Sequence, residues 1–245
     1  TLGVIALQVH KMNRILIFSF IMIIGISYAQ TDTLRVLFLG NSYTSVNNLP
    51  NITADLAISN GDYLYTELNT PGGYTLEQHA TNEISQQKIR KGNWDFVILQ
   101  EQSQIPTIEI HKDNSMYPAA RRLNDSIKKH NPCATTLFYM TWGRRFGGQQ
   151  CDDSGVNCSP DFVDFTHMQD SLESAYWRIS QELNAQVAPA GIAWKKVITE
   201  NDIVLHASDD SHPNFSGSYL TACVFNSIIW NTNTYENSFI GTLDE

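Results

Sequence analysis

The sequence predicts an α/β fold of three layers, α/β/α, in which helices cover both faces of a mainly parallel, five-stranded sheet. Two observations lead to this prediction. Five short apolar segments alternate along the chain with five longer segments that have helical periodicity, and such alternation is typical of parallel strands joined by crossover helices. In addition, 245 residues, of which 42% are hydrophobic, suffice for one domain with a sizeable core.

The individual elements follow from local signals. A helix near 49–60 begins at Pro50, which suits a first helical turn, and Gly61 ends it. The most regular helix, 165–183, repeats apolar residues at steps of three and four. The remaining helices are expected at 76–91, 119–130 and 215–230. The strands are expected at 34–39, 63–68, 94–99, 135–140 and 186–190.

Residues 142–160 are rich in Gly, Asp and Cys and predict a long loop. Loops of this length inside a compact domain are usually either functional or disordered. We therefore expect this segment to shape a binding site or to form a surface loop.

Charge narrows the class of partner. The chain has 16 Lys and Arg against 25 Asp and Glu, a net charge of −9. No stripe of basic residues is available to neutralise phosphates, so nucleic acid is not an expected partner.

Within the N-terminal segment 1–29, residues 11–29 have the pattern of a cleavable signal peptide, and the residues before Met12 are expected to be upstream sequence. Lys11 and Arg14 precede an apolar run at 15–26, and small residues end at Ala29, where cleavage is expected. The run falls short of the roughly 20 residues that span a bilayer, which disfavours a membrane anchor. We therefore predict a start at Met12, export to the periplasm or medium, and a single mature domain at 30–245 without a membrane span.

Four cysteines lie in the predicted mature part. Their even number in an exported chain permits disulfides. Cys151 and Cys158 flank a short polar loop and are the favoured pair, whereas Cys133 and Cys223 either pair or stay reduced. The spacings do not match a zinc site.

The segment Gly40-Asn41-Ser42 marks the first candidate site residue. An apolar strand ends there, and it delivers the Ser42 hydroxyl into a polar turn. Ligands of open α/β sheets bind beyond the carboxyl ends of the strands, so Ser42 is well placed to act as a nucleophile. A turn without catalytic function gives the same pattern.

A second polar segment, 208–214, precedes the last helix and contains Asp209 and His212. An Asp three residues before a His is able to orient the imidazole as a general base. Two other interpretations stay open. The segment is also typical of a helix cap, and His206, Asp209, Asp210 and His212 together are potential metal ligands.

Two further segments supply candidate hydrogen-bond donors. Gly73 follows the second expected strand, and Gln102 follows the third. A backbone N–H and a side-chain amide at this edge of the sheet are suited to stabilise an oxyanion. A plain turn and a polar strand end are the structural alternatives.

Taken together and in this order, the four segments resemble the blocks of the SGNH (GDSL-like) hydrolase family. Gly40-Asn41-Ser42 resembles the first block with Asn in place of Asp, Gly73 lies in the second, and Asp209 to His212 resembles the final Asp-x-x-His. The third block departs from the family, because Gln100-Glu101-Gln102 replaces Gly-x-Asn. It resembles an exported branch that carries Gln-Glu-Gln there. The resemblance implies a flavodoxin-like SGNH hydrolase fold.

The resemblance also implies roles for these residues. Ser42 attacks an ester carbonyl, His212 accepts its proton, and Asp209, or the adjacent Asp210, orients the imidazole. The N–H groups of Ser42 and Gly73, with Gln102, form the oxyanion hole. No metal or other cofactor is expected.

The implied activity is that of a serine esterase, with a small-molecule or polysaccharide ester as substrate and an O-acetyl or other acyl group on carbohydrate as the first choice. We expect substrate contacts from Asn41 and Tyr43 beside the serine, and from Trp142 and Arg144 in the long loop, because aromatic and Arg side chains suit sugar rings and carboxylates. The altered third block also permits a non-catalytic carbohydrate-binding protein on a degenerate scaffold.

Overall fold

The computed structural model describes residues 33–232 and 239–242. The expected signal peptide and cleavage position at 1–29 lie outside the described residues. Within the described residues, none of the helices combines the length and the apolar character needed to cross a membrane.

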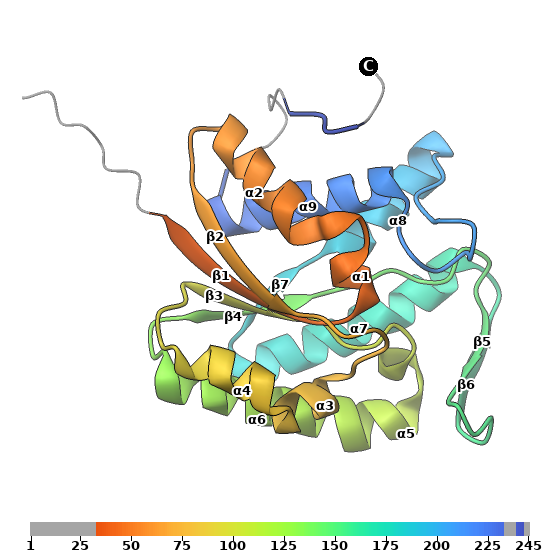
Figure 1. Ribbon diagram of the computed structural model, residues 1–245. Coiled ribbons are helices and arrows are strands. Elements are labelled where there is room, and N and C mark those ends of the chain that lie inside the picture. Colours follow the sequence, from red (N-terminus) through yellow and green to blue (C-terminus); the bar gives the residue numbers. More distant parts are fainter. Residues whose placement is uncertain (1–32, 233–238, 243–245) are drawn as a thin grey trace, which may run out of the picture. The chain divides into compact units, whose positions relative to one another are not determined.

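The centre of the fold is a five-stranded sheet in the order β2-β1-β3-β4-β7 (Figure 1). Every pair of neighbouring strands runs parallel, which confirms the predicted fold class. In β1 the side chains alternate between the two faces, because Val36 and Phe38 enter one core and Leu37 and Leu39 the other. The strands are β1 (Leu34–Leu39), β2 (Leu64–Asn69), β3 (Phe96–Leu99), β4 (Thr135–Tyr139) and β7 (Gln186–Ala188).

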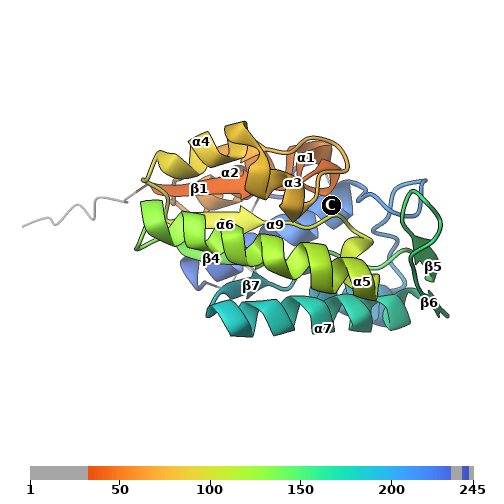
Figure 2. The same ribbon diagram turned by 90° about the horizontal axis from the view of Figure 1, so that it is seen from below.

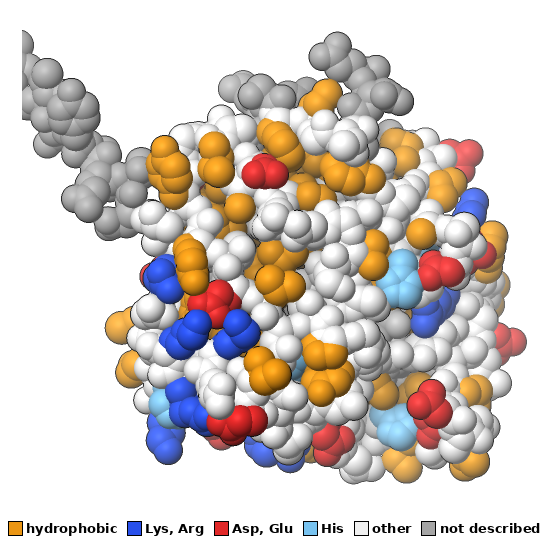
Figure 3. All heavy atoms as spheres, viewed as in Figure 1, with side chains coloured by type: hydrophobic (Ala, Val, Ile, Leu, Met, Phe, Trp, Pro, Cys, Tyr) orange, Lys and Arg blue, Asp and Glu red, His pale blue; other side chains and the backbone are white. Residues whose placement is uncertain are grey.

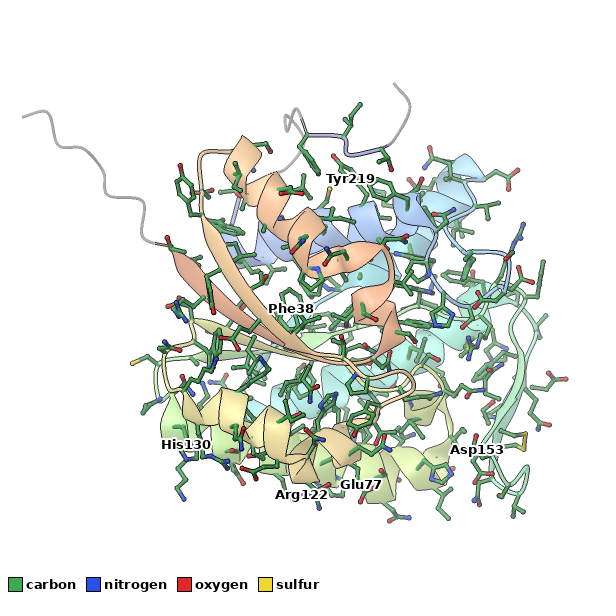
Figure 4. The ribbon with its side chains drawn as sticks, viewed as in Figure 1. Phe38, Glu77, Arg122, His130, Asp153 and Tyr219 are labelled. Carbon is green, nitrogen blue, oxygen red and sulfur yellow. A yellow bond between two sulfur atoms is a disulfide. The ribbon has the colours of Figure 1, made fainter. Side chains whose placement is uncertain are left out.

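Helices cover both faces of the sheet and make two separate apolar cores (Figures 1 and 2). One face carries α3 (Leu76–Thr81), α4 (Glu83–Arg90), α6 (Tyr117–His130) and α7 (Phe165–Leu183). The other carries α2 (Leu49–Ser59), α8 (Ala190–Asn201) and α9 (Phe215–Trp230). Phe38, labelled in Figure 4, packs edge-on against Phe225 of α9.

Two sequence predictions need correction in this part of the chain. The helix expected at 76–91 is split, because Asn82 has extended backbone dihedrals and its side chain caps α4 at the Ser85 N–H. The sequence did not predict the helix α8. Only Pro189 separates it from β7, and its first residue, Ala190, was included in the strand expected at 186–190. Single helical turns, including α5 (Glu109–His111), also occupy 105–116 before α6.

The expected loop at 142–160 contains an antiparallel hairpin of β5 (Gly148–Cys151) and β6 (Cys158–Phe162). A disulfide joins Cys151 to Cys158, which confirms the favoured pairing, whereas neither Cys133 nor Cys223 takes part in a disulfide within the described residues. Figure 4 shows Asp153 in the turn of this hairpin, near the disulfide. The segment therefore has its own backbone pairing and a covalent link.

On the face drawn in Figure 3, Lys and Arg side chains lie beside Asp and Glu side chains. Glu67 of β2 binds Lys88 of α4 and Lys91, the residue after that helix, at 2.7 and 2.6 Å. Glu77 and Arg122, both labelled in Figure 4, are 3.8 Å apart. Charges of opposite sign are thus paired locally on this face.

Candidate active site

Ser42 lies just beyond the carboxyl end of β1, in the first turn of the short helix α1 (Ser42–Ser45). Asn41 caps this turn, because its side-chain oxygen accepts the Tyr43 N–H at 3.1 Å. The cap fixes the backbone on both sides of Ser42, whose side chain is partly exposed. The Ser42 hydroxyl therefore has a defined position at the carboxyl edge of the sheet.

The hydroxyl of Ser42 meets the ring of His212, 170 residues later in the chain. Ser42 Oγ and His212 Nε2 are 2.8 Å apart, and His212 Nδ1 lies 2.5 Å from Asp209 Oδ2. Partial burial acts to raise the pKa of Asp209, but hydrogen bonds from the His212 ring and from nearby N–H groups lower it to about 2. At neutral pH the carboxylate is therefore ionised and accepts a hydrogen bond from Nδ1–H. In this tautomer Nε2 is the acceptor for the Ser42 hydroxyl.

The Asp209 carboxylate orders the loop around His212 through short-range contacts. Asp209 Oδ1 accepts the N–H groups of Ser211 and His212 at 3.0 and 2.9 Å, while Oδ2 is reserved for the imidazole. The carboxylate of Asp210 instead faces Arg145 at 3.2 Å. Of the two adjacent carboxylates, Asp209 is the one in contact with His212.

Two side chains fasten the histidine loop to the rest of the site. The Tyr43 and Ser211 hydroxyls lie 2.7 Å apart, and Trp142 Nε1 donates to the Ser211 carbonyl at 3.0 Å. Tyr43 and Trp142 are stacked, with ring centroids 5.0 Å apart, and Trp142 stacks in turn on Trp194. An aromatic column thus supports the pocket from within the core.

Ser42 and Gly73 line the same pocket, and their backbone N–H groups have no acceptor among the described residues. Gly73 has φ +70°, in the left-handed region that favours glycine. The nearby Gln102 side chain is partly committed, because its Oε1 accepts the Gln104 and Ile105 N–H groups and its Nε2 donates to Gln104. One hydrogen on Gln102 Nε2 stays available.

A pocket of about 220 Å³ lies over Ser42 and His212. Its wall comes from segments that follow β1, β2, β3 and β4, and it includes Gly73, Gln102 and Arg144. In open parallel sheets the carboxyl ends of the strands form such crevices. The four polar segments of the sequence thus converge on one cavity.

The fold matches known structures along most of the chain. The chain is 23% identical to a protein from Slackia heliotrinireducens classed provisionally with the SGNH hydrolases, over 81% of this chain and 100% of that one, with a TM-score of 0.66. A DUF4886 family protein from Bacteroides uniformis gives 18% identity, 86% and 88% coverage and a TM-score of 0.72. A catalytic mutant of an acetylxylan esterase from Geobacillus stearothermophilus is 13% identical, over 80% of this chain and 94% of that one, with a TM-score of 0.51.

The chain has the SGNH hydrolase fold. No protein-family model and no curated sequence matches the chain. At these identities the structural matches establish the fold, and the activity has to be argued from the residues of the pocket.

Within this SGNH fold, the first residue of the altered third block, Gln100, has a role that the sequence did not reveal. Its Oε1 accepts the Asn41 N–H at 2.8 Å and the Thr44 hydroxyl at 2.9 Å, and its Nε2 donates to Asn41 Oδ1 at 2.9 Å. The fit is tight, since a Cβ on Gly40 would lie 2.5 Å from Gln100 Oε1. Gln100 therefore braces the serine turn and explains the glycine before it.

The neighbouring Glu101 links the second and third blocks of the SGNH pattern. Its side chain is fully buried, and its Oε1 accepts the N–H groups of Leu76 and Gln102 at 3.0 and 2.7 Å. Burial raises the pKa of this carboxyl to about 8, so it is mainly protonated at neutral pH. Because glutamate is usually exposed, the sequence did not indicate that Glu101 is part of the core.

The four expected substrate contacts have different outcomes. Asn41, Tyr43 and Arg144 line the pocket. Trp142 does not, because it is 1% exposed and lies between Tyr43 and Trp194. The expectation of a substrate contact from Trp142 is therefore wrong, and this side chain supports the wall from behind.

The potential metal ligands of segment 206–212 do not converge. His206 is buried and its Nε2 is 2.9 Å from the Gly143 carbonyl, whereas Asp210 faces Arg145. No group of three or more His, Cys, Asp or Glu residues suited to a metal ion is present in the described ranges. The helix-cap interpretation holds for the last residue of segment 208–214, because the Asn214 side chain caps α9 at the Gly217 N–H, while Asp209 contacts His212.

Proposed function

We propose that this protein is an exported serine esterase that hydrolyses carboxylic esters through Ser42, His212 and Asp209. The observation that carries the proposal is the continuous chain of contacts from the Ser42 hydroxyl through the His212 ring to the Asp209 carboxylate, at 2.8 and 2.5 Å. This order of hydroxyl, imidazole and carboxylate is the one that serine hydrolases use. The Cys151–Cys158 disulfide supports export, since disulfides persist in oxidising compartments.

The proposed reaction has two halves. Ser42 Oγ attacks the ester carbonyl while His212 Nε2 takes its proton, and the resulting imidazolium returns that proton to the leaving alcohol. Water then attacks the acyl-enzyme with His212 again as the base, which releases the acid and regenerates Ser42. In both steps the N–H groups of Ser42 and Gly73 bind the oxyanion, with the free hydrogen of Gln102 Nε2 as a third donor.

The size and walls of the pocket favour a short acyl group. A volume of about 220 Å³ is below the range of pockets that bury drug-sized ligands. An acetyl or similar acyl ester on carbohydrate is therefore the proposed substrate, in line with the acetylxylan esterase among the similar structures.

Two variants test the proposal on short aryl esters. Ser42→Ala and His212→Ala are each expected to lower kcat by about 10³-fold or more, because the serine and the histidine act as one unit. Circular dichroism and the melting temperature serve as the folding control, and a fluorophosphonate probe is expected to label the wild type but not Ser42→Ala. Wild-type turnover in both variants would eliminate the assignment, and saturable glycan binding without turnover would favour the carbohydrate-binding alternative.

A further inference from the structure

Arg144 is a charged side chain of the pocket that the proposed reaction does not use. It lies beyond β4 and lines the same cavity as Ser42 and His212. Its guanidinium donates to Gln150 Oε1 through Nε at 3.2 Å, to Tyr43 Oη through Nη1 at 3.1 Å and to Ser103 Oγ through Nη2 at 3.3 Å. A guanidinium has five N–H donors. Two therefore have no protein acceptor among the described residues, one on each terminal nitrogen.

Arg144 also has no acidic partner in the part of the chain that the structure describes. The two acidic residues that adjoin the pocket-lining Ser211 and His212 are engaged elsewhere, because Asp209 binds His212 and Asp210 binds Arg145. No carboxylate lines the cavity. In a chain with 25 acidic residues, a partly buried arginine bound only to neutral acceptors is an electrostatically unsatisfied cation.

The position of the guanidinium is well defined. Gln150, 6% exposed on β5, accepts from both Arg144 Nε and Gln104 Nε2, and it donates to the Gly147 and Gly148 carbonyls. The disulfide at Cys151 holds the adjacent strand pair together. Three fixed acceptors on three segments thus orient the arginine, which lowers the entropy cost of binding a ligand.

From these contacts we infer that Arg144 selects esters that carry a carboxylate near the scissile bond. The inference rests on the proposed esterase function and deepens it, since it names the class of substrate. The planar fork of an arginine matches a carboxylate in a bidentate geometry, which a neutral acetyl ester does not exploit. The carboxylate belongs either to the alcohol part, as in an ester on an acidic sugar, or to the acyl part, as in a half-ester of a dicarboxylic acid.

Two pairs of matched substrates test the inference on the full-length protein. The first pair places the charge in the alcohol part, with 3-acetoxybenzoate against 3-acetoxybenzamide. The second pair places it in the acyl part, with ethyl hydrogen adipate against ethyl adipamate. The readout is the ratio of kcat/KM for the acid to kcat/KM for its neutral amide, which a general loss of activity does not move.

The wild type is expected to prefer the acid at least about tenfold in one pair, as a charge-assisted bidentate contact requires. Arg144→Gln is expected to bring that ratio to about one, and Arg144→Lys to restore part of it. Arg145→Gln is the matched control, since it removes the same charge from the adjacent residue, which pairs with Asp210 outside the pocket. It is expected to keep the wild-type ratio.

The outcomes separate the two proposals. Turnover of both members of each pair at equal rates overturns the role of Arg144 and leaves the esterase function intact. An unchanged ratio in Arg144→Gln, or an equal loss in Arg145→Gln, overturns it as well. Absence of turnover for all four esters overturns the proposed function and the inference together.

Discussion

The loop that carries Ser42 and the loop that carries His212 meet in one pocket, but different kinds of contact hold them. The serine loop is bound by side chains that are almost fully buried, with Asn41 2%, Thr44 1% and Gln100 0% exposed. Those contacts connect residues 56 to 59 positions apart. The side chains of His212 and Asp209 are 33% and 50% exposed, and Asp209 orders its loop through residues two and three positions away.

This difference predicts different consequences of damage. On the serine side, the loss of a buried hydrogen-bond partner leaves other buried groups unsatisfied, so stability falls together with activity. On the histidine side, the groups are partly hydrated, so a substitution acts mainly on the chemistry. The nucleophile is therefore positioned by the core, whereas the base is positioned by one local carboxylate.

The largest expected effect comes from Asp209→Asn on the histidine side. The amide still accepts N–H bonds at Oδ1, but it no longer stabilises the Nδ1–H tautomer or the imidazolium. We expect kcat for a short aryl ester to fall by about 10³-fold, with little change in the melting temperature.

Asp210→Asn is the matched control, because that carboxylate faces Arg145 and does not contact the ring. It is expected to stay within a few-fold of wild type. Equal losses in the two variants would show that either carboxylate orients His212, and the contrast between the loops would then be wrong on this side.

The second expected effect is a change of about 2 kcal/mol in the free energy of unfolding with pH, caused by Glu101, which follows Gln100 on the serine side. Glu101 has its pKa raised to about 8, against an ordinary value of 4.5. A raised folded-state pKa contributes stability that is complete below pH 4.5 and is lost as pH rises through about 8. Between pH 6.5 and 8.5 the free energy of unfolding is therefore expected to fall by about 2 kcal/mol.

Urea unfolding at several pH values measures this dependence. In Glu101→Gln, which mimics the protonated acid, the decline is expected to disappear. Glu77→Gln changes a nearby carboxyl whose side chain is 53% exposed, and it should retain the wild-type decline. On the histidine side, the lowered pKa of Asp209, about 2, affects stability only in acid. A decline that persists in Glu101→Gln would locate the titration elsewhere.

The same contrast explains how much the sequence was able to predict. The sheet was predictable because buried parallel strands are short apolar runs such as 34–39 and 135–140. Asp209 and His212 were recognisable as a unit because their contact spans only three residues. Local patterns in the sequence are informative where the contacts themselves are local.

The remaining features depend on contacts between distant residues or on weak local competition. Nothing in the sequence near Gln100 indicates that its side-chain amide binds both the backbone N–H and the side chain of Asn41, 59 positions away. The break at Asn82 depends on a cap that competes with continued helix, and the 142–160 hairpin depends on pairing across a disulfide. As an aromatic residue Trp142 is suited to contact a sugar ring, but it is buried between Tyr43 and Trp194, and this burial follows from the tertiary fold.

The smallest expected effect tests the contact that joins the two loops. The hydroxyls of Tyr43 and Ser211 are 2.7 Å apart and buried, and they link residues 168 positions apart. Tyr43→Phe, Ser211→Ala and the double variant form a cycle, in which unfolding free energies are expected to give a coupling of about 1 kcal/mol. The kcat is expected to fall several-fold in each variant, because the Ser42–His212 distance is then less restricted.

A second cycle supplies the control for this coupling. Tyr74→Phe removes a hydroxyl that accepts from Asn82 and has no contact with Ser211 within the described ranges. Combined with Ser211→Ala, it is expected to be additive. If the Tyr43–Ser211 coupling were also zero, the alignment of the two loops at 2.8 Å would have to come from other contacts, such as those of Trp142 to Ser211 and of Asn47 to Pro213 and Ser218. A measurable coupling instead means that the Tyr43 hydroxyl helps the buried serine loop to position the more exposed histidine loop.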